Sequence, residues 1–261
     1  MRKFSLLSQR SVLMAVGLTV LGAALAFPQA RDRGYRLFRD MESRRQAPKD
    51  SEFVFARIRY NAGGRGFFGG GGWAHDYPDA EEHILQVASE ATGINLNKMS
   101  YVIIDLDDEA IFQYPFAYFS EVGEMQLTER EIVIFREYLN RGGFAMIDDF
   151  DSQYWLDHFQ SQMRRVFPER NFQRMKLQDA IFHTFYEIPT LDIEPPYRSG
   201  DGGRPTFYGY YDDRGQLLMI INHNNDVGDF WEWIDQPRYP LQPSTEALRF
   251  GINYFLFALT H

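Results

Sequence analysis

Carboxylate, imidazole and amide side chains follow apolar runs of this sequence at several points. Asp148-Asp149 come directly after the run Phe144–Ile147. The stretch Asn222–Asp226, which contains a histidine, follows the run Leu217–Ile221. Such groups bind divalent cations and also hydrogen-bond polyols. The pattern predicts a ligand- or cation-binding site; the alternative is that these residues only cap helices and form turns.

The apolar runs are typical of strands in a mainly parallel sheet. Glu52–Tyr60 alternates in polarity, and Tyr101–Leu106 is apolar almost throughout, as in a strand buried on both faces. Helical patterns separate the runs, so we expect an α/β sandwich of three layers, with a β-hairpin near 206–221. The carboxyl ends of parallel strands share one edge, where ligands bind. The candidate ligand-binding residues at or near that edge are Tyr60, Asp76, Asp105, Asp148, Asp149, His183, Asn222, His223, Asn224 and Asp226.

Four segments have the apolar periodicity of helices. The second begins with a capping box formed by Thr128 and Glu131 and ends at Gly142. Asp151 or Ser152 is the expected N-cap of the third segment. The four segments are Asp79–Ala91, 128–142, Ser152–Val166 and Ser244–Leu259.

Two segments combine aromatic residues with glycine or polar groups. Gly64-x-Gly66-x-x-Gly69 matches a dinucleotide-binding pattern, but no helix opens at its third glycine, so a nucleotide cofactor is not expected. We expect instead a flap with exposed Phe67, Phe68 and Trp73 that closes over a ligand or contacts a partner. Further along, Phe230–Trp233 could stack against sugars or could simply cover the edge of the core.

Composition excludes several classes of chemistry. The chain has no cysteine, so thiol nucleophiles, thiolate zinc sites and iron–sulfur clusters are ruled out. It also lacks the G-x-S-x-G nucleophile motif. Residues 51–261 hold 17 Lys and Arg against 32 Asp and Glu. This negative charge repels phosphate backbones, so no nucleic-acid partner is expected.

Residues 1–26 have the pattern of a secretory signal peptide. A basic start leads into an apolar run that ends at Ala24-Leu25-Ala26. We therefore expect a periplasmic or secreted protein, or alternatively one anchored in the membrane by an uncleaved helix and facing the periplasm. Residues 27–50 are expected to be a basic linker, with a membrane tether through residues 1–50 as the alternative. Residues 51–261 are expected to form a single α/β domain.

The order of several short motifs resembles a bacterial family, domain-of-unknown-function family 4159. The resemblance runs from about Phe53 to Leu259 and implies a flavodoxin-like sheet of the class I glutamine-amidotransferase-like type. The amidotransferases use a cysteine nucleophile, which this chain lacks, so glutamine hydrolysis is not implied. The motifs are Arg59-Tyr60, Tyr114-Pro115-Phe116 with Tyr118, Leu127-Thr128, Gly142-Gly143-Phe144 leading to Asp148-Asp149, His183 with Phe185-Tyr186, Asn222-x-Asn224 with Gly228-Asp229, and Gly251-x-Asn253.

Two functions are consistent with these features. The first is a binding or assembly module of the cell envelope, whose partners would be envelope proteins or glycans. The second is a hydrolase of envelope carbohydrate that depends on a metal or on carboxylates, with Asp148, Asp149, His183 and His223 as candidate catalytic residues. The cofactor, if any, would be a divalent cation. A perturbed group of acids at the edge of the sheet would favour the enzyme, and an exposed aromatic patch would favour the binding module.

Overall fold

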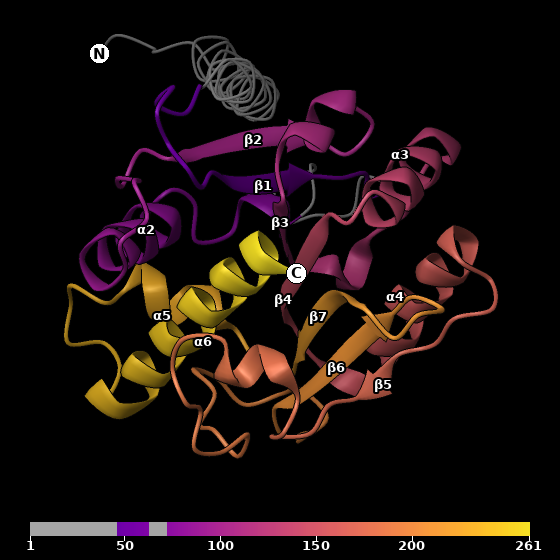
Figure 1. Ribbon diagram of the computed structural model, residues 1–261. Helices are drawn as coiled ribbons and strands as arrows, with labels where there is room; N and C mark the ends of the chain where they lie inside the picture. The colour runs from indigo at the N-terminus through magenta and orange to yellow at the C-terminus, as the bar shows by residue number, and fades with distance from the viewer. Residues whose placement is uncertain (1–45, 63–71) are drawn as a thin grey trace, which may run out of the picture. The chain divides into compact units, whose positions relative to one another are not determined.

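The structure is a computed structural model that describes residues 46–62 and 72–261. Its core is one sheet of seven strands in the order β2-β1-β3-β4-β7-β6-β5 (Figure 1). The first five strands in this order are parallel, whereas β6 runs antiparallel to β7 and to β5. The strands are β1 (Phe55–Arg59), β2 (Tyr101–Asp105), β3 (Phe116–Ser120), β4 (Phe144–Phe150), β5 (Gln173–Arg174), β6 (Thr206–Tyr211) and β7 (Leu217–His223).

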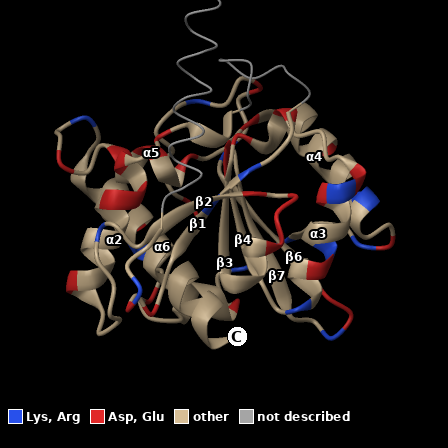
Figure 2. Ribbon diagram, turned by 90° about the horizontal axis from the view of Figure 1, so that it is seen from above, with Lys and Arg blue, Asp and Glu red and all other residues tan. Residues whose placement is uncertain are grey.

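Helices cover both faces of this sheet. Figure 2 shows α2 and α6 on one face and α3 and α4 on the other, so the domain has three layers. The predicted α/β sandwich with a mainly parallel, flavodoxin-like sheet and a hairpin at β6–β7 is therefore confirmed. The α-helices are α2 (Asp79–Ala91), α3 (Glu129–Asn140), α4 (Ser152–Val166), α5 (Val227–Glu232) and α6 (Leu241–Thr260).

Each face of the sheet has its own apolar core. Ala56 and Ile58 of β1 belong to the core beneath α3 and α4, whereas Phe55 belongs to the core beneath α2 and α6. The alternation follows from the two-residue repeat of a strand. It explains why the central strands carry apolar residues on both faces, with Arg57 of β1 as a buried charged exception.

Four elements differ from the sequence expectations. Strands β4 and β7 are longer than their apolar runs, so Asp148, Asp149 and Asn222 lie inside strands and are buried. Strand β3 and the short helix α5 were not predicted. Phe230 and Trp231 of α5 are buried, so most of the segment Phe230–Trp233 covers the core instead of forming an open platform.

One local prediction was wrong, and a second was confirmed in position but not in its hydrogen bond. Trp73 is fully buried, not exposed on a flap, because its side chain belongs to the core beneath α3 and α4. Asp151 occupies the N-cap position of α4 but makes no capping hydrogen bond there. Its Oδ2 instead accepts a hydrogen bond of 2.5 Å from the backbone N–H of Gly200.

Several expectations fall outside the described residues. They concern the signal peptide at 1–26, most of the basic linker and the glycine-rich loop with Phe67 and Phe68. Among the described helices, none combines the length and the apolar character that crossing a membrane requires. Contacts divide the chain after Arg45, and residues 46–261 form one unit.

Candidate functional site

A cluster of acidic side chains and one imidazole lies at the carboxyl-terminal edge of the sheet. His75 and Asp76 come from the segment between β1 and α2, Asp149 from β4, and Asp226 from the turn between β7 and α5. The order of the parallel strands reverses between β1 and β3, and ligands bind beside such a reversal in open α/β sheets. The topology therefore brings three segments that are distant in the sequence to the edge where ligands are expected to bind.

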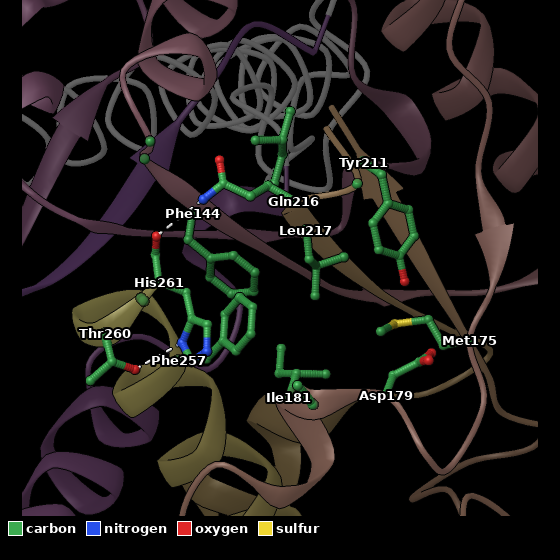
Figure 3. A pocket seen from close by; sticks show the side chains of 16 residues that line it. Phe144, Met175, Asp179, Ile181, Tyr211, Gln216, Leu217, Phe257, Thr260 and His261 are labelled. Atoms are coloured by element: carbon green, nitrogen blue, oxygen red, sulfur yellow. Dashed lines mark hydrogen bonds between the residues drawn. The ribbon is translucent and has the colours of Figure 1, made fainter. Parts of the chain in front are cut away.

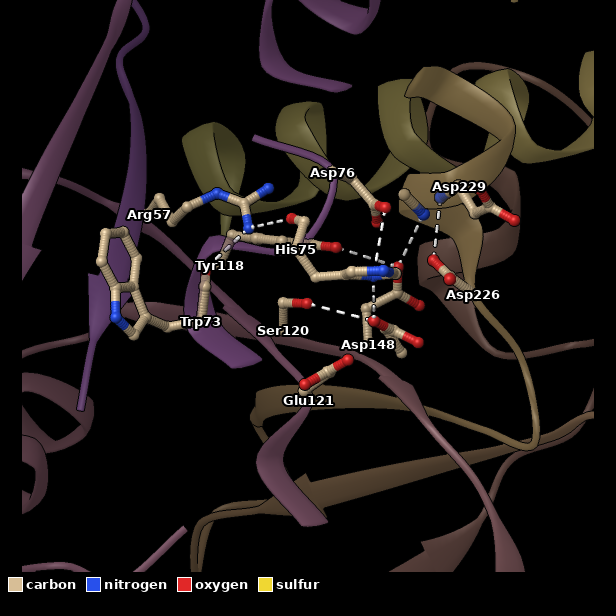
Figure 4. A network of polar contacts seen from close by, with 12 residues as sticks. Arg57, Trp73, His75, Asp76, Tyr118, Ser120, Glu121, Asp148, Asp226 and Asp229 are labelled. Atoms are coloured by element: carbon tan, nitrogen blue, oxygen red, sulfur yellow. Dashed lines mark hydrogen bonds and ion pairs between the residues drawn. The ribbon is translucent and has the colours of Figure 1, made fainter. Parts of the chain in front are cut away.

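The four side chains are close enough to share one ion. One ligand atom from each of His75, Asp76, Asp149 and Asp226 lies within 4.8 Å of all the others. Nδ1 of His75 lies 2.8 Å from Oδ2 of Asp149 and 3.1 Å from Oδ1 of Asp76. Figure 4 shows the imidazole reaching toward Asp76 and the neighbouring carboxylates. Asp76, Asp149 and Asp226 are buried, whereas His75 is exposed on one side.

The carboxylate of Asp76 is the least satisfied group in the cluster. Its side chain is only 1% exposed. Within residues 46–62 and 72–261, neither of its oxygens accepts a hydrogen bond. Its basic neighbour is the ring of His75, whose Nδ1 lies 3.1 Å from Oδ1. Burying a carboxylate without hydrogen bonds is costly, so this side chain is preorganised for a cationic ligand.

Asp148, next to the cluster, is fully hydrogen-bonded by the protein. Its oxygens accept hydrogen bonds from the Tyr118 hydroxyl at 3.2 Å, the Asn222 amide at 3.1 Å and the Gly228 backbone N–H at 2.8 Å. The hydroxyl of Tyr254 in turn donates to the Asn222 amide oxygen at 3.2 Å. Asp148 thus connects β3, β4, β7 and the start of α5, and it positions the cluster without belonging to it.

Arg57 of β1 positions the segment that carries His75 and Asp76. Its guanidinium pairs with Glu81 of α2 in the protein interior, and both side chains are 0% exposed. The Nη1 atom donates hydrogen bonds of 2.7 Å to the carbonyl oxygens of Trp73 and of His75. The guanidinium also lies 4.7 Å from the centre of the Tyr118 ring. Arg57 therefore fixes the backbone on which the two cluster residues stand.

The electrostatics of the cluster follow from burial and like charge. Burial, together with the neighbouring Asp149, raises the pKa of Asp76 and of Asp226 well above the usual range. The hydrogen bond to Asp149 raises the pKa of His75 to about 10. Burial also raises the pKa of Asp148 to about 7, although its hydrogen bonds from Gly228 and Asn222 oppose the shift. Perturbed acids grouped in this way are typical of functional sites.

A cavity of about 310 Å³ opens beside Asp149. Glu121, at the end of β3, and Asp151 add carboxylates to its wall, while Trp155 and Tyr197 add aromatic rings. Burial and the nearby Asp149 raise the pKa of Glu121 to about 7. A small ligand in this cavity would therefore contact both the acidic cluster and flat apolar surfaces.

Comparison with known proteins places the chain in a family. Residues 54–259 match the family described as Domain of unknown function (DUF4159). The chain belongs to this family. The match covers the whole sheet and all the described helices except the last residue of α6, so the acidic cluster lies inside this DUF4159 domain. No curated protein matches the chain.

The DUF4159 domain brings about half of the predicted site residues together. Asp76, Asp149 and Asp226 are members of the cluster, and Asp148 with Asn222 supports it. The Tyr60 hydroxyl donates hydrogen bonds of 2.7 Å to the carbonyl oxygens of Ser120 and Glu121, so it fixes the end of β3.

Four predicted residues lie outside the cluster. Asp105 forms an ion pair with Arg59 at the far strand β2. His183 lies in a short 3₁₀ helix, where it contacts Glu187 and the carbonyl oxygen of Leu177. The ring of His223 lies 3.0 Å from the carbonyl oxygen of Ser152, and Asn224 bonds to backbone groups of Ser152 and Arg204. These residues therefore hold loops in place.

Sequence reasoning missed His75, Asp229 and Glu232, which complete the acidic edge. Asp226, Asp229 and Glu232 recur every three residues, which is a helical spacing that could have revealed α5. His75 gives no comparable signal, because only the path of the chain after β1 brings it to the cluster.

A larger cavity of about 530 Å³ lies at the opposite edge of the sheet, where β4 and β7 begin (Figure 3). Its walls are largely apolar, with Phe144, Met175, Ile181 and Phe257 among them. Asp179 and His261 are the only Asp, Glu, Lys, Arg or His side chains among the described residues that line it. Its size favours the larger cavity as a binding site, whereas the grouping of perturbed acids makes the smaller cavity the candidate functional site.

Proposed function

We propose that this chain is a divalent-cation-dependent hydrolase whose cation is bound by His75, Asp76, Asp149 and Asp226. The observation that carries the proposal is the buried carboxylate of Asp76, which accepts no hydrogen bond from the described residues and faces three further potential ligands. A divalent cation would satisfy both its oxygens and the negative charge around it.

The ligand set favours a transition metal over calcium. Imidazole nitrogen binds Zn²⁺, Fe²⁺ and related ions well, and carboxylates suit Mn²⁺ and Mg²⁺. One nitrogen with three carboxylates is a mixed set of this kind, whereas Ca²⁺ takes oxygen ligands almost throughout. We therefore expect Mn²⁺ or Zn²⁺ to bind more tightly than Ca²⁺.

The neighbouring cavity supplies room for a substrate. A cation held by His75, Asp76, Asp149 and Asp226 would lower the pKa of a bound water and so would supply a nucleophile at neutral pH. Hydrolysis would join the water oxygen to the substrate and break the bond to the leaving group, which would take up a proton. Glu121, which lines the same cavity as Asp149, is placed to carry that proton. The rings of Trp155 and Tyr197 beside carboxylates suit a carbohydrate or another polyol.

The test begins with metal binding to the full chain after removal of bound metal with a chelator. Isothermal titration with Mn²⁺ and with Zn²⁺ should show binding, and Asp76→Asn should abolish it. Asp107→Asn is the matched control, because Asp107 is an exposed carboxylate in the loop after β2. The loaded protein is then assayed on esters and on glycosides with and without chelator. Absence of binding by either ion to the wild-type protein would exclude the proposed function.

A cation-dependent binding module is the second candidate. The side chain of Tyr154 is highly exposed at 68%, and its ring lies 4.7 Å from that of Trp155, which lines the smaller cavity. An aromatic pair with one exposed ring, beside a polar cavity, could bind an envelope glycan or protein. Glycan binding that requires the cation but leaves the glycan intact would support this candidate over the hydrolase.

We also propose that the domain acts outside the cytoplasm. A signal peptide at residues 1–26 would deliver the domain to the periplasm or medium, and residues 1–50 would tether it to the membrane if the peptide stays uncleaved. Mass spectrometry of the N-terminus of the natural protein distinguishes a cleaved signal peptide from an uncleaved anchor.

The sheet order β2-β1-β3-β4-β7 supports a relationship to flavodoxin-type folds, including the glutamine-amidotransferase-like proteins.

A further inference from the structure

Helix α5 carries a second group of acids beside the first. Asp226 at its N-cap is followed by Asp229 and Glu232, each three residues further along. This spacing places the three side chains on one side of the helix. Oxygens of Asp229, Glu232 and Asp76 lie within 4.8 Å of one another, in a group separate from the one that contains His75.

Asp76 is common to both groups, and its two oxygens face different ways. Oδ1 lies 3.1 Å from Nδ1 of His75, in the first group. Oδ2 faces α5, because a β-carbon placed on Gly228 would come within 3.0 Å of it. Neither oxygen accepts a hydrogen bond within residues 46–62 and 72–261, and the side chain is 1% exposed. Both oxygens of Asp76 are thus available to a ligand.

Carboxylates outnumber basic groups around Asp76. The two groups together contain five carboxylates, those of Asp76, Asp149, Asp226, Asp229 and Glu232, and a single imidazole. The nearest guanidinium, that of Arg57, is already paired with Glu81 and bonded to two carbonyl oxygens. Asp229 is buried and Glu232 is half-buried, so solvent screens this charge poorly.

We infer that Asp76 bridges two divalent cations, one bound with His75, Asp149 and Asp226 and the other bound with Asp229 and Glu232. This inference rests on the proposed function, because it adds a second ion beside the first. A carboxylate that bridges two ions uses both of its oxygens. Both oxygens of Asp76 accept no hydrogen bond from the described residues, so both can bind an ion. Two ions about 3.5–4 Å apart can bind both the attacking and the leaving oxygen of a hydrolysed group.

The test counts the bound ions in the full-length protein, with Mn²⁺ as the probe. Metal analysis and isothermal titration should give two equivalents for the wild-type chain and one for Glu232→Gln. Asp76→Asn should abolish the binding of both ions, because it removes the carboxylate that they share. Electron paramagnetic resonance should show exchange-coupled Mn²⁺ in the wild type and an isolated Mn²⁺ in Glu232→Gln. The spectrum gives a readout that loss of stability alone would not produce.

Asp235→Asn is the matched control, because Asp235 follows Glu232 by three residues but its side chain is 58% exposed. Circular dichroism of the metal-free proteins checks that each variant folds; if Asp76→Asn does not fold, Glu232→Gln alone decides. One equivalent in the wild type, unchanged by Glu232→Gln, would overturn the bridged pair and leave the proposed function standing. If the wild type binds no ion, both the bridged pair of ions and the proposed function are wrong.

Discussion

Gly228 shows how closely the residues of the site approach one another. A β-carbon at this position would come within 2.6 Å of the Tyr118 hydroxyl and 3.0 Å of Oδ2 of Asp76. Its backbone N–H also donates a hydrogen bond of 2.8 Å to Asp148. The missing side chain therefore allows the start of α5 to approach both acids. Glycine is needed here because a β-carbon would not fit, and not because the backbone has an unusual conformation.

Gly228→Ala should move α5 away from Asp76 and Asp148. We expect a loss of stability of about 1–3 kcal/mol, as for other overpacked positions, together with weaker Mn²⁺ binding. Denaturant unfolding and isothermal titration measure the two effects. Gly93→Ala is the control, because a β-carbon there meets no atom within 4 Å. Equal stability and affinity in the two variants would contradict the close approach.

His223 should make the fold sensitive to mild acid. Burial lowers its pKa below the usual value, although the carbonyl of Ser152 and the acids Asp201 and Asp151 oppose the shift. The unfolded chain therefore takes up a proton at a higher pH than the native state does. Stability is fully present above about pH 6.5 and is lost as the pH falls toward the native pKa.

His223→Gln should flatten this dependence, since glutamine does not titrate. The free energy of unfolding, measured between pH 7.5 and pH 5.5 in chelator, should fall less steeply in this variant than in the wild type. His261→Gln, at the exposed C-terminal residue, should keep the wild-type slope. A wild-type slope in His223→Gln would mean that other groups cause the acid sensitivity.

At the scale of elements, the start of α3 connects the helix layer to the end of β1. The Thr128 side chain accepts a hydrogen bond of 3.2 Å from the Glu131 backbone N–H, and Glu131 Oε2 accepts one of 2.7 Å from the Thr128 backbone N–H. The other oxygen of Glu131 accepts a hydrogen bond of 2.7 Å from the backbone N–H of Asn61. The capping box predicted from the sequence thus also fixes the chain where it leaves β1.

Thr128→Ala removes the side-chain cap and should cost about 0.5–2 kcal/mol of stability. Thr245→Ala is the control, because Thr245 lies within α6, where alanine favours the helix. Thermal and denaturant unfolding measure both variants. A cost no greater than that of Thr245→Ala would show that solvent can replace the cap.

At the scale of the whole molecule, the acids of the site oppose folding until a cation binds. Asp76 and Asp226 are buried with raised pKa values, and like charge surrounds them. A ligand that binds only the native state stabilises it by mass action. Cation binding should therefore change the stability of the entire domain and not only of α5.

Mn²⁺ at 100 times its dissociation constant should stabilise the wild-type chain by about 2.7 kcal/mol for one site. For a domain of this size that corresponds to a rise in Tm of roughly 5–10 °C. Differential scanning calorimetry with Mn²⁺ and with chelator measures the shift, and Asp76→Asn should show none. Asp107→Asn should retain the shift, and an equal shift in Asp76→Asn would place the ion elsewhere.

Local patterns in the sequence were sufficient to predict the class of fold and most of its elements. The bounds of α2 and α4, the capping box of α3 and the β6–β7 hairpin follow from periodicity, caps and turn residues, which act over a few neighbouring residues. Asp148-Asp149 and Asp226 were also identified, because polar residues after apolar runs mark strand ends. Short elements were missed: β3 lies among aromatic residues without a clear repeat, and α5 has only six residues.

Only the tertiary structure decided which polar residues meet. His183 and His223 looked as well suited as His75, yet loop paths lead them to Glu187 and to the carbonyl of Ser152. His75 reaches Asp149, 74 positions away, because Arg57 and Glu81 hold its segment against the sheet. Contacts of this kind depend on the packing of distant segments, which local patterns do not encode, so the ligand set could be recognised only once the sheet was assembled.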